Sequence, residues 1–481
     1  METTTTDVIV IGAGAVGENV VDRVIAGGLE AIVVEHELVG GECSYWACEP
    51  SKTLLRSGAA LRAAQRVPGA AEAVTGPLDA DAVLARRNAR VGDWDDSGQV
   101  RWLEGVGATL VRGHARLDGE RRVRVAGADG EERLLEARHA VVVATGSAPK
   151  LPDIDGLALV RPWTSREATS AQQVPGRLAI IGGGVVGCEM ATAWASLGSE
   201  VTLLSRSGLL SKFEPFAGDA VTAGIRALGV DVRTGCTPTA VHRDADDRVV
   251  LALPDGEELV ADEVLVATGR RARVEDVGLE TVGLDTEGWI DVDDTLRVRA
   301  GGLDWLYAAG DVTGRALLTH QGKYQARAAG DAIAARAAGA EVDDDAWGAH
   351  VATADHAAVP QVAFTEPEAA TVGLTAADAE QRGIRTRVVE YDLGWVAGAT
   401  DRADGYEGRA NLVVDEDRRV VVGATFVGQD VAELLHAATI AVVGEVPIDR
   451  LWHAVPSFPT LSEVWLRLLE AYGRPGHEGA A

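Results

Sequence analysis

The segment Asp7-Val-Ile-Val-Ile-Gly12-Ala-Gly14-Ala-Val-Gly17 decides the organisation of this chain. An apolar run of strand length enters a turn with three glycines, and a helical pattern to Ala26, a second apolar run (31–34) and Glu35 follow. The glycines let the backbone approach a pyrophosphate at a helix N-terminus, and the acid can accept hydrogen bonds from ribose hydroxyls. The alternative is a glycine-rich turn in another α/β fold. The full strand, turn, helix, strand and acid order favours a dinucleotide site.

The same pattern occurs a second time. An apolar run (177–181) leads into Gly182-Gly183-Gly184-Val-Val-Gly187, a helical pattern through Ala195, and a strand that closes on Ser205. Glu35 and Ser205 each lie 23 residues after the first glycine of their copy. Two later apolar strands both end in Ala-Thr-Gly, at Thr145-Gly146 and at Thr268-Gly269. The sequence therefore predicts two dinucleotide sites of the same construction.

Two of the four cysteines follow the first copy, in Gly40-Gly41-Glu42-Cys43-Ser44-Tyr45-Trp46-Ala47-Cys48-Glu49-Pro50-Ser51-Lys52. Five steps of regular helix would separate their Cα atoms by roughly 7.5 Å, beyond the ~7 Å at which a disulfide can close. The pair can bridge only across a distorted turn, and Pro50 permits a helix to begin just after Cys48. Either the pair is redox-active, as cytosolic pairs more often are, or it is two buried small apolar residues.

Composition bounds the class of protein. With 481 residues, 47% apolar and 25% charged, the chain has room for about three folded domains. A net charge of −28 disfavours nucleic acid and anionic membranes as partners. The polar N-terminus does not resemble a signal peptide, no apolar run has the length of a membrane span, and four cysteines make no disulfide scaffold. We expect a cytoplasmic protein without a metal site.

The last segment changes character. Strand-like runs alternate with turns, and two helical patterns follow, which suggests an α+β domain. The runs lie at 361–365, 387–393, 410–415 and 420–427, and the helical patterns at 431–443 and 462–472. We predict an α/β protein with two Rossmann-like dinucleotide-binding domains and a C-terminal α+β dimerisation domain. The expected boundaries are 1–150 with 271–345, 151–270, and 346–481.

These pieces together resemble the flavoprotein disulfide reductases, the class I pyridine nucleotide-disulfide oxidoreductases that include dihydrolipoamide dehydrogenase, glutathione reductase and mercuric reductase. The resemblance runs nearly end to end. It includes both glycine fingerprints, the cysteine segment, Tyr307-Ala-Ala-Gly310-Asp311-Val-Thr and the final Pro459-Thr-Leu-Ser-Glu463. It implies FAD on the first fingerprint, a nicotinamide dinucleotide on the second, and a homodimer formed through the third domain.

The resemblance also implies residue roles. Electrons would pass from nicotinamide to flavin to the cysteine pair, with Cys43 exchanging with substrate and Cys48 facing the flavin. Asp311 would hold the ribityl chain, unless it is an ordinary turn aspartate. Lys52 and Glu189 match the family's ion pair near the flavin N5, where a cation would stabilise reduced, anionic flavin; the alternative for the lysine is a solvated helix position. The remaining expected cofactor contacts are Gly41, Thr145, Gly146 and Gly269.

The second strand end bears on the choice of nicotinamide cofactor. An NAD site would carry an acid there, but this chain has Ser205 and Arg206, with Lys212 six residues further. A carboxylate would repel a 2′-phosphate, whereas serine and arginine accept it. The alternative is a surface arginine in an arginine-rich protein. We predict NADPH in preference to NADH.

One departure from the family pattern concerns the acid–base group. Dithiol-using members place a histidine, supplied by the partner subunit and oriented by a glutamate, where this chain has Phe458. Losing a positioned general base typically costs about 10²–10⁴ in rate. Glu463 either keeps an orienting role or is a structural acid. His453 either substitutes for the missing base or is an ordinary packed or surface histidine.

The cysteine segment departs as well. Tyr45 and Trp46 would line the substrate face with Phe458, or else pack in the core. Glu42 and Glu49 flank the cysteines, and nearby carboxylates oppose thiolate formation. We predict an NAD(P)H-oxidising flavoenzyme whose acceptor is a small disulfide-type or other electrophile. The alternatives are direct transfer from flavin to a quinone, dye, metal ion or pyridine nucleotide, and a flavin-bearing redox sensor.

Overall fold

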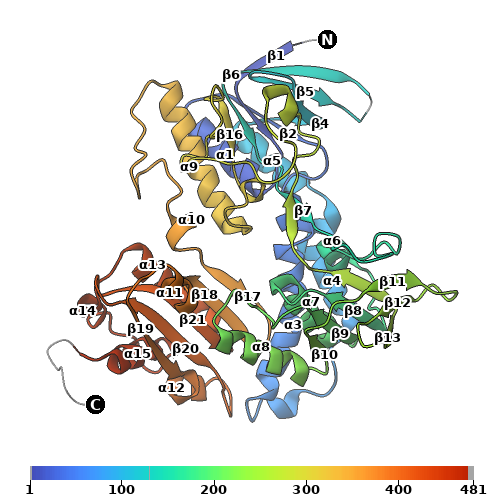
Figure 1. Ribbon diagram of the computed structural model, residues 1–481, viewed down its shortest axis with the longest axis vertical. Coiled ribbons are helices and arrows are strands. Elements are labelled where there is room, and N and C mark those ends of the chain that lie inside the picture. Colours follow the sequence, from blue (N-terminus) through green and yellow to red (C-terminus); the bar gives the residue numbers. More distant parts are fainter. Residues whose placement is uncertain (1–2, 129, 475–481) are drawn as a thin grey trace. The chain divides into compact units, whose positions relative to one another are not determined.

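The computed structural model describes residues 3–128 and 130–474, which form two compact units (Figure 1). The first unit combines the chain up to Pro50 with 88–150 and 270–355. The second combines 51–87, 151–269 and the chain from His356 onward. The three domain boundaries expected from the sequence stay a prediction, but the α/β class is confirmed.

A seven-stranded sheet organises the first unit. Its parallel part has the order β3-β2-β1-β6, β16 also pairs in parallel with β6, and β5 and β4 extend the sheet in antiparallel fashion. Val8, Ile9 and Val10 have no exposed surface, as expected for a strand covered on both faces. The strands are β1 (Thr3–Ile11), β2 (Ala31–Glu35), β3 (Thr109–Arg112), β4 (His114–Leu117), β5 (Arg122–Ala126), β6 (Glu132–Val143) and β16 (Leu306–Ala308).

Two helices of the first unit pack against each other beside this sheet, as Figure 1 shows. They are α1 (Ala15–Ala26), which follows the first glycine turn, and α9 (Thr319–Ala337). A Cβ at Gly322 would lie 2.6 Å from Val16 Cγ2, and one at Gly310 would lie 2.8 Å from the same atom. Glycine at these positions therefore lets the N-terminus of α9 and the turn before it approach the first turn of α1.

The second unit repeats the parallel construction. Its sheet has the order β10-β9-β8-β14, and a three-stranded antiparallel sheet, β11-β12-β13, lies in the same sequence region. The strands are β8 (Arg177–Ile181), β9 (Glu200–Ser205), β10 (Asp231–Thr234), β11 (Ala240–Arg243), β12 (Val249–Ala252), β13 (Glu258–Ala261) and β14 (Glu263–Val266). The helices α7 (Val185–Ser196) and α8 (Pro215–Ala227) belong to this region. Both fingerprints thus have the predicted strand, turn, helix and strand order.

The C-terminal segment forms a five-stranded antiparallel sheet in the order β17-β18-β21-β20-β19. Its strands are β17 (Gln361–Ala363), β18 (Glu368–Gly373), β19 (Thr386–Asp392), β20 (Arg409–Asp415) and β21 (Val420–Gly428). Helix α13 (Leu435–Val443) packs on β21, and α15 (Val464–Tyr472) packs on β19. Sequence analysis missed β18 because its residues are small and its apolar alternation is weak.

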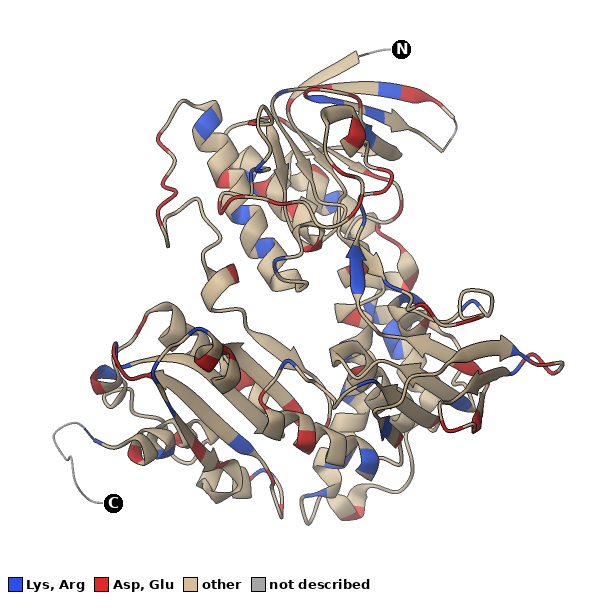
Figure 2. Ribbon diagram, viewed as in Figure 1, with Lys and Arg blue, Asp and Glu red and all other residues tan. Residues whose placement is uncertain are grey.

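Two helices follow the cysteine segment. Helix α3 (Cys48–Gln65) ends before a short 3-10 turn (Ala71–Ala73), and α4 (Ala80–Arg90) follows. Lys and Arg are interspersed with Asp and Glu over both units (Figure 2). In the described part of the chain, no helix is both long and apolar enough to cross a membrane.

Candidate functional site

In the first glycine turn, two glycines leave no room for a Cβ because other backbone atoms lie against them, and the third faces open space. Gly12 has φ +100°, and a Cβ there would lie 2.6 Å from the Ala144 carbonyl oxygen. A Cβ at Gly17 would lie 1.9 Å from the Gly12 carbonyl oxygen. At Gly14 the nearest atom, Gly41 Cα, would be 3.9 Å away. This turn therefore leaves the N-terminus of α1 accessible, which fits a dinucleotide pyrophosphate.

Glu35 ends β2 as a buried, ionised acceptor. Its carboxylate accepts hydrogen bonds from the backbone N–H groups of Ala13 and Glu37, both at 2.8 Å. Burial disfavours the charge, but hydrogen bonds from His36 and these two N–H groups outweigh it, so the pKa of Glu35 is lowered. The ionised side chain fits the expected ribose contact.

The second glycine turn repeats this geometry. A Cβ at Gly182 would lie 2.3 Å from the Ala267 carbonyl oxygen, and one at Gly187 would lie 1.9 Å from the Gly182 carbonyl oxygen. At Gly184 nothing lies within 4 Å, so the N-terminus of α7 is open as well. This turn also fits a dinucleotide.

The loop after β9 presents two exposed cations. Ser205 is buried and its side chain lies against Gly183, while the Leu210 N–H donates to the Gly183 carbonyl at 2.8 Å and fixes the loop. Arg206 and Lys212 are exposed, and neither has an ion-pair partner among residues 3–128 and 130–474. Their charges are available to an anionic group near this turn.

Asp311 begins a short 3-10 turn, η4 (Asp311–Thr313), in the first unit. It accepts a hydrogen bond from the Ser147 hydroxyl at 2.5 Å, and the Arg270 Nε lies 3.8 Å from the same carboxylate. Burial raises the pKa of Asp311, against the effect of these partners. The strands β7 (Ser147–Pro149) and β15 (Arg270–Ala272) hold the two partners side by side.

At the Ala-Thr-Gly strand ends, Thr145 makes an internal contact, whereas the two glycines leave space. The Thr145 hydroxyl donates to the Arg273 carbonyl at 2.7 Å, so this side chain supports the first unit internally. Gly146 has φ +73° and Gly269 has φ +137°, with nothing within 4 Å of a Cβ at either position. These two glycines leave open space at the ends of their strands.

The cysteine pair lies across a break between two helices. Helix α2 (Gly41–Tyr45) ends before Trp46, and α3 begins at Cys48, so the segment between the cysteines is not regular helix. Both cysteines are thiols in this structure. A hydrogen bond with Cys48 and burial raise the pKa of the Cys43 thiol. Cys48 Sγ lies 3.3 Å from the Thr319 hydroxyl at the start of α9. The break thus brings the thiols together, as the spacing required.

The carboxylates beside the cysteines are paired with arginines. Glu42 forms an ion pair of 2.7 Å with Arg273, and Glu49 forms one of 2.6 Å with Arg90. The expectation that these carboxylates oppose thiolate formation stays a prediction, and the ion pairs weaken its basis. Each arginine offsets the charge of its partner.

Of the two alternatives for Tyr45, the structure has the one in which its ring packs in the core. Its side chain is 1% exposed, its ring centroid lies 5.6 Å from that of Trp46, and burial raises its pKa to about 12. Its ring packs inside the first unit, whereas Trp46 is partly exposed. In the described part of the chain its hydroxyl has no hydrogen-bond partner.

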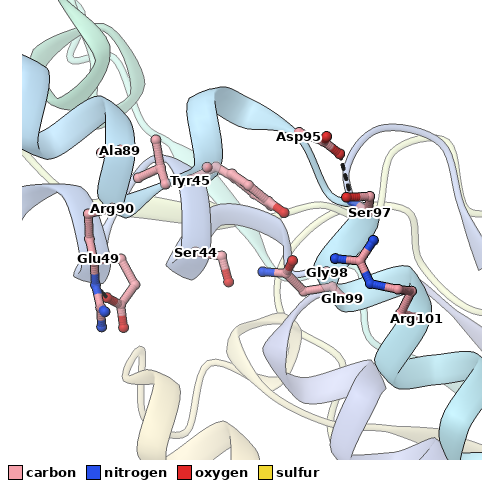
Figure 3. A pocket seen from close by; sticks show the side chains of 12 residues that line it. Ser44, Tyr45, Glu49, Ala89, Arg90, Asp95, Ser97, Gly98, Gln99 and Arg101 are labelled. Carbon is pink, nitrogen blue, oxygen red and sulfur yellow. Dashed lines mark hydrogen bonds and ion pairs between the residues drawn. The ribbon is translucent and has the colours of Figure 1, made fainter.

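A polar pocket of about 510 Å³ lies along α2 (Figure 3). Ser44 and Tyr45 border it from α2, and the hydroxyl end of Tyr45 points toward the side that carries Ser97 and Gln99. The other lining residues are Glu49, Ala89, Arg90, Val91, Gly92, Asp95, Gly98 and Arg101. Sequence analysis did not anticipate this pocket.

Lys52 lies one helical turn after Cys48 on α3. Its ammonium forms an ion pair of 2.7 Å with Glu189 on α7 and lies 5.0 Å from the centroid of the Phe364 ring. The Phe364 N–H donates to the other oxygen of Glu189 at 3.0 Å. The predicted lysine–glutamate pair is thus formed, and Phe364 is a partner that sequence reasoning missed.

Phe458 and Glu463 lie in the C-terminal segment. Phe458 is 75% exposed, and His453 is also exposed. The buried carboxylate of Glu463 accepts hydrogen bonds from Arg467 at 2.7 Å and from the Ala397 N–H at 3.4 Å. The four-residue spacing on a helix was the available signal for the missed arginine. Glu463 is therefore engaged within its own chain.

Comparisons with known proteins agree with this organisation. Residues 6–333 match the family described as pyridine nucleotide-disulphide oxidoreductase, and residues 359–468 match its dimerisation domain. The chain is 34% identical to a mercuric reductase of Shigella flexneri over 465 residues, which cover 95% of this chain and 78% of that one. It is 32% identical to a dihydrolipoyl dehydrogenase of Haloferax volcanii over 496 residues, 98% of each chain.

A solved structure shows the same fold. The Cu(II) complex of the HOCl-induced flavoprotein disulfide reductase RclA from Escherichia coli superposes with a TM-score of 0.82 at 22% identity, covering 97% of this chain and 99% of that one. The matched families account for both glycine turns, the cysteine pair and the C-terminal sheet. The chain belongs to the pyridine nucleotide-disulphide oxidoreductases and is a flavin-dependent enzyme that uses FAD and NAD(P)H.

Proposed function

We propose that this enzyme oxidises NADPH and passes the electrons through Cys43 and Cys48 to a small electrophilic acceptor, such as a disulfide-type compound, that needs no protein base at position 458. The hydrogen bond between the two thiols across the α2–α3 break carries this proposal. FAD held at the first glycine turn would supply the chemistry that accepts a hydride from the nicotinamide and passes two electrons to the disulfide form of the pair.

Residues of this chain would bind FAD and orient the Cys48 thiol. We infer that Glu35 holds the adenosine ribose of FAD and that Asp311 holds the flavin side chain, because both are buried acceptors fixed by neighbouring groups. The Thr319 hydroxyl touches Cys48 and fixes its thiol. Lys52, held by Glu189, would supply positive charge near the reduced flavin.

The loop after β9 supports NADPH over NADH. No acid closes the strand, and the two exposed cations, Arg206 and Lys212, have no ion-pair partner in the described ranges. An arginine binds a 2′-phosphate with charge-assisted hydrogen bonds, whereas the 2′-hydroxyl of NADH offers no comparable charge.

The pocket along α2 is the proposed entrance for the acceptor. It borders Ser44 and Tyr45, the two residues that follow Cys43, and its lining is mostly polar. Arg101 and Gln99 suit an acceptor with polar or anionic groups (Figure 3). An apolar acceptor would leave these groups without partners.

A homodimer is supported by the C-terminal segment. Residues 359–468 match the dimerisation domain. Trp395, Ile440, Val455 and Phe458 are large apolar side chains that are exposed in this segment. Exposed apolar side chains of this kind favour a protein interface. A cytoplasmic location stays a prediction.

An acceptor screen on the holoenzyme tests the proposal. NADPH oxidation would be followed with disulfides, quinones and dyes for the wild type, Cys43→Ser, Cys48→Ser and, as a matched control, Cys236→Ser. We expect either active-site substitution to lower disulfide reduction by at least about 10²-fold, with the control unchanged. Disulfide reduction that survives both active-site substitutions would refute the proposal.

One observation favours a second candidate function. The hydrogen bond with Cys48 and burial raise the pKa of Cys43, which favours the less nucleophilic thiol at neutral pH. Electrons could then leave from FAD directly to a quinone, dye or metal ion. Quinone reduction at wild-type rate in the double Cys43→Ser/Cys48→Ser variant, together with no disulfide reduction by the wild type, would support this second function.

A further inference from the structure

Lys323 on α9 and Glu18 on α1 belong to two packed helices beside the segment that carries the cysteine pair, and neither belongs to a motif singled out from the sequence. Thr319, which touches Cys48, and Lys323 are four residues apart on α9 and therefore share one helix face. Glu18 lies in the first turn of α1, and α1 packs on α9 through Val16. The N-terminus of α1 also meets α2, because the Gly40 N–H donates to the Ala13 carbonyl at 2.8 Å.

Both side chains are unpaired in the described part of the chain. The Lys323 ammonium has no ion-pair partner there, and Glu18 Oε1 is buried without a hydrogen-bond partner. Lys323 is also one of only four lysines in a chain whose other basic residues are arginines. Keeping a half-buried charge without an ion-pair partner costs free energy. That cost is offset when a neighbouring group, such as a thiol, becomes oppositely charged during the reaction.

We propose that Lys323 is a positioning residue that stabilises the thiolate of Cys43 by its positive charge, and that Glu18 opposes it when its carboxylate is ionised. This proposal rests on the proposed function of the cysteine pair. The step is an acid dissociation: the S–H bond of Cys43 breaks, its electron pair stays on sulfur, and the proton goes to solvent. The charge on α9 thereby does part of what a base at position 458 would do.

The electrostatics agree with this geometry. The hydrogen bond with Cys48 and burial raise the pKa of Cys43, and the Thr319 hydroxyl and the Lys323 charge act in the opposite direction. Burial raises the pKa of Glu18 to about 7, against the attraction of Lys323. Glu18 is therefore neutral below about pH 7 and competes for the ammonium above it. The other charged or titratable groups that act on Glu18, Tyr45 or Cys43 are Glu35, Cys48, Asp95, Asp96 and Arg112.

The test measures how fast iodoacetamide alkylates Cys43 from pH 6 to 10. The reduced holoenzyme would carry Cys48→Ser, so that one active-site thiol remains, and peptide mass spectrometry would separate Cys43 from Cys236. We expect Lys323→Met to lower the alkylation rate at pH 8 roughly 3- to 10-fold, about 0.5 to 1 pH unit. Lys323→Arg should restore it. Glu18→Gln should raise the rate at pH 8 and remove the inflection near pH 7.

Two controls separate a charge effect from a structural one. Arg327→Met removes an exposed cation one turn further along α9 and should leave the profile unchanged. FAD content and the visible spectrum of each variant report whether the first unit is intact. If the profiles of Lys323→Met and the parent coincide in intact protein, the inference is wrong even where the acceptor screen supports the cysteine pair. Acceptor reduction without either cysteine would refute the proposed function and leave the alkylation result standing.

Discussion

Replacing Lys52 by methionine removes the cation of the Lys52–Glu189 pair while keeping a side chain of similar length. The two charged atoms are 2.7 Å apart, and the side chains are 37% and 4% exposed. At this distance the attraction is about 6 kcal/mol at an effective dielectric of 20 and about 1.5 kcal/mol in water. Because the lysine is more than one-third exposed, solvent screening places the net contribution near the lower figure, at about 2 kcal/mol.

The variant leaves Glu189 buried with the Phe364 N–H as its remaining described partner. We expect the holoenzyme to lose about 2 kcal/mol, which corresponds to a fall in Tm of roughly 2 °C, because a chain of 481 residues unfolds with an entropy of about 1 kcal/mol/K. Thermal denaturation followed by circular dichroism at fixed FAD concentration measures it. Glu189→Gln keeps hydrogen-bonding capacity and should cost about 1 kcal/mol.

A double-mutant cycle completes the test. Lys52→Met/Glu189→Gln should lose less than the sum of its parts, with a coupling of about 1–2 kcal/mol. As a matched control, Arg90→Met breaks the exposed pair with Glu49 and should cost less than about 1 kcal/mol. The reasoning fails if Lys52→Met unfolds at the temperature of the wild type or of Arg90→Met.

Four further predictions follow from the geometry. Arg206→Ala should raise KM for NADPH about 10- to 100-fold, as expected for the loss of a charge-assisted contact, with KM for NADH unchanged; equal effects on both cofactors would contradict the 2′-phosphate role. Gly17→Ala would place a Cβ 1.9 Å from the Gly12 carbonyl oxygen, so the purified protein should lack FAD absorbance; a full flavin complement would contradict this. Burial raises the pKa of Glu18 to about 7, so as the pH rises the unfolded state ionises first, and the free energy of unfolding of the wild type falls between about pH 4.5 and 7. Urea titrations should therefore find Glu18→Gln more stable than the wild type by about 1–2 kcal/mol at pH 8 and equal to it at pH 4. Equal stabilities of the two proteins at both pH values would contradict this prediction. Phe458→His should give little or no gain in dithiol exchange in rate assays, and a gain above about 10²-fold would contradict the engagement of Glu463 within its own chain.

The elements around the glycine turns could be predicted from the sequence. An apolar run, a glycine with a φ of +100° or more and a helical pattern are local features. Helix α1, strand β8 and helix α7 begin and end close to where these features place them, and β1 ends at Ile11 as predicted but begins earlier, at Thr3. The distorted turn between Cys43 and Cys48 was predictable on the condition that the two cysteines form a disulfide, because five steps of regular helix would hold their Cα atoms too far apart.

Side-chain partners from distant sequence positions could not be predicted. Glu42 finds its arginine 231 residues away, and Lys52 lies over a ring from residue 364. The burial of Tyr45 depends on helices that the cysteine segment does not contain. The same limit explains why Lys323 was missed: its significance comes from the packing of α9 on α1, which leaves no local signal.

The ion pair between Glu463 and Arg467 has a consequence for re-engineering this enzyme. A histidine introduced at position 458 would need a carboxylate to hold its ring, and the nearest one in sequence is already bound, four residues along, by its own helix. Gaining dithiol exchange assisted by a base at this position thus requires two coordinated changes, one to add the imidazole and one to release the acid, such as Arg467→Met. Either substitution alone would be neutral or harmful, so a search through single substitutions would not find the active combination.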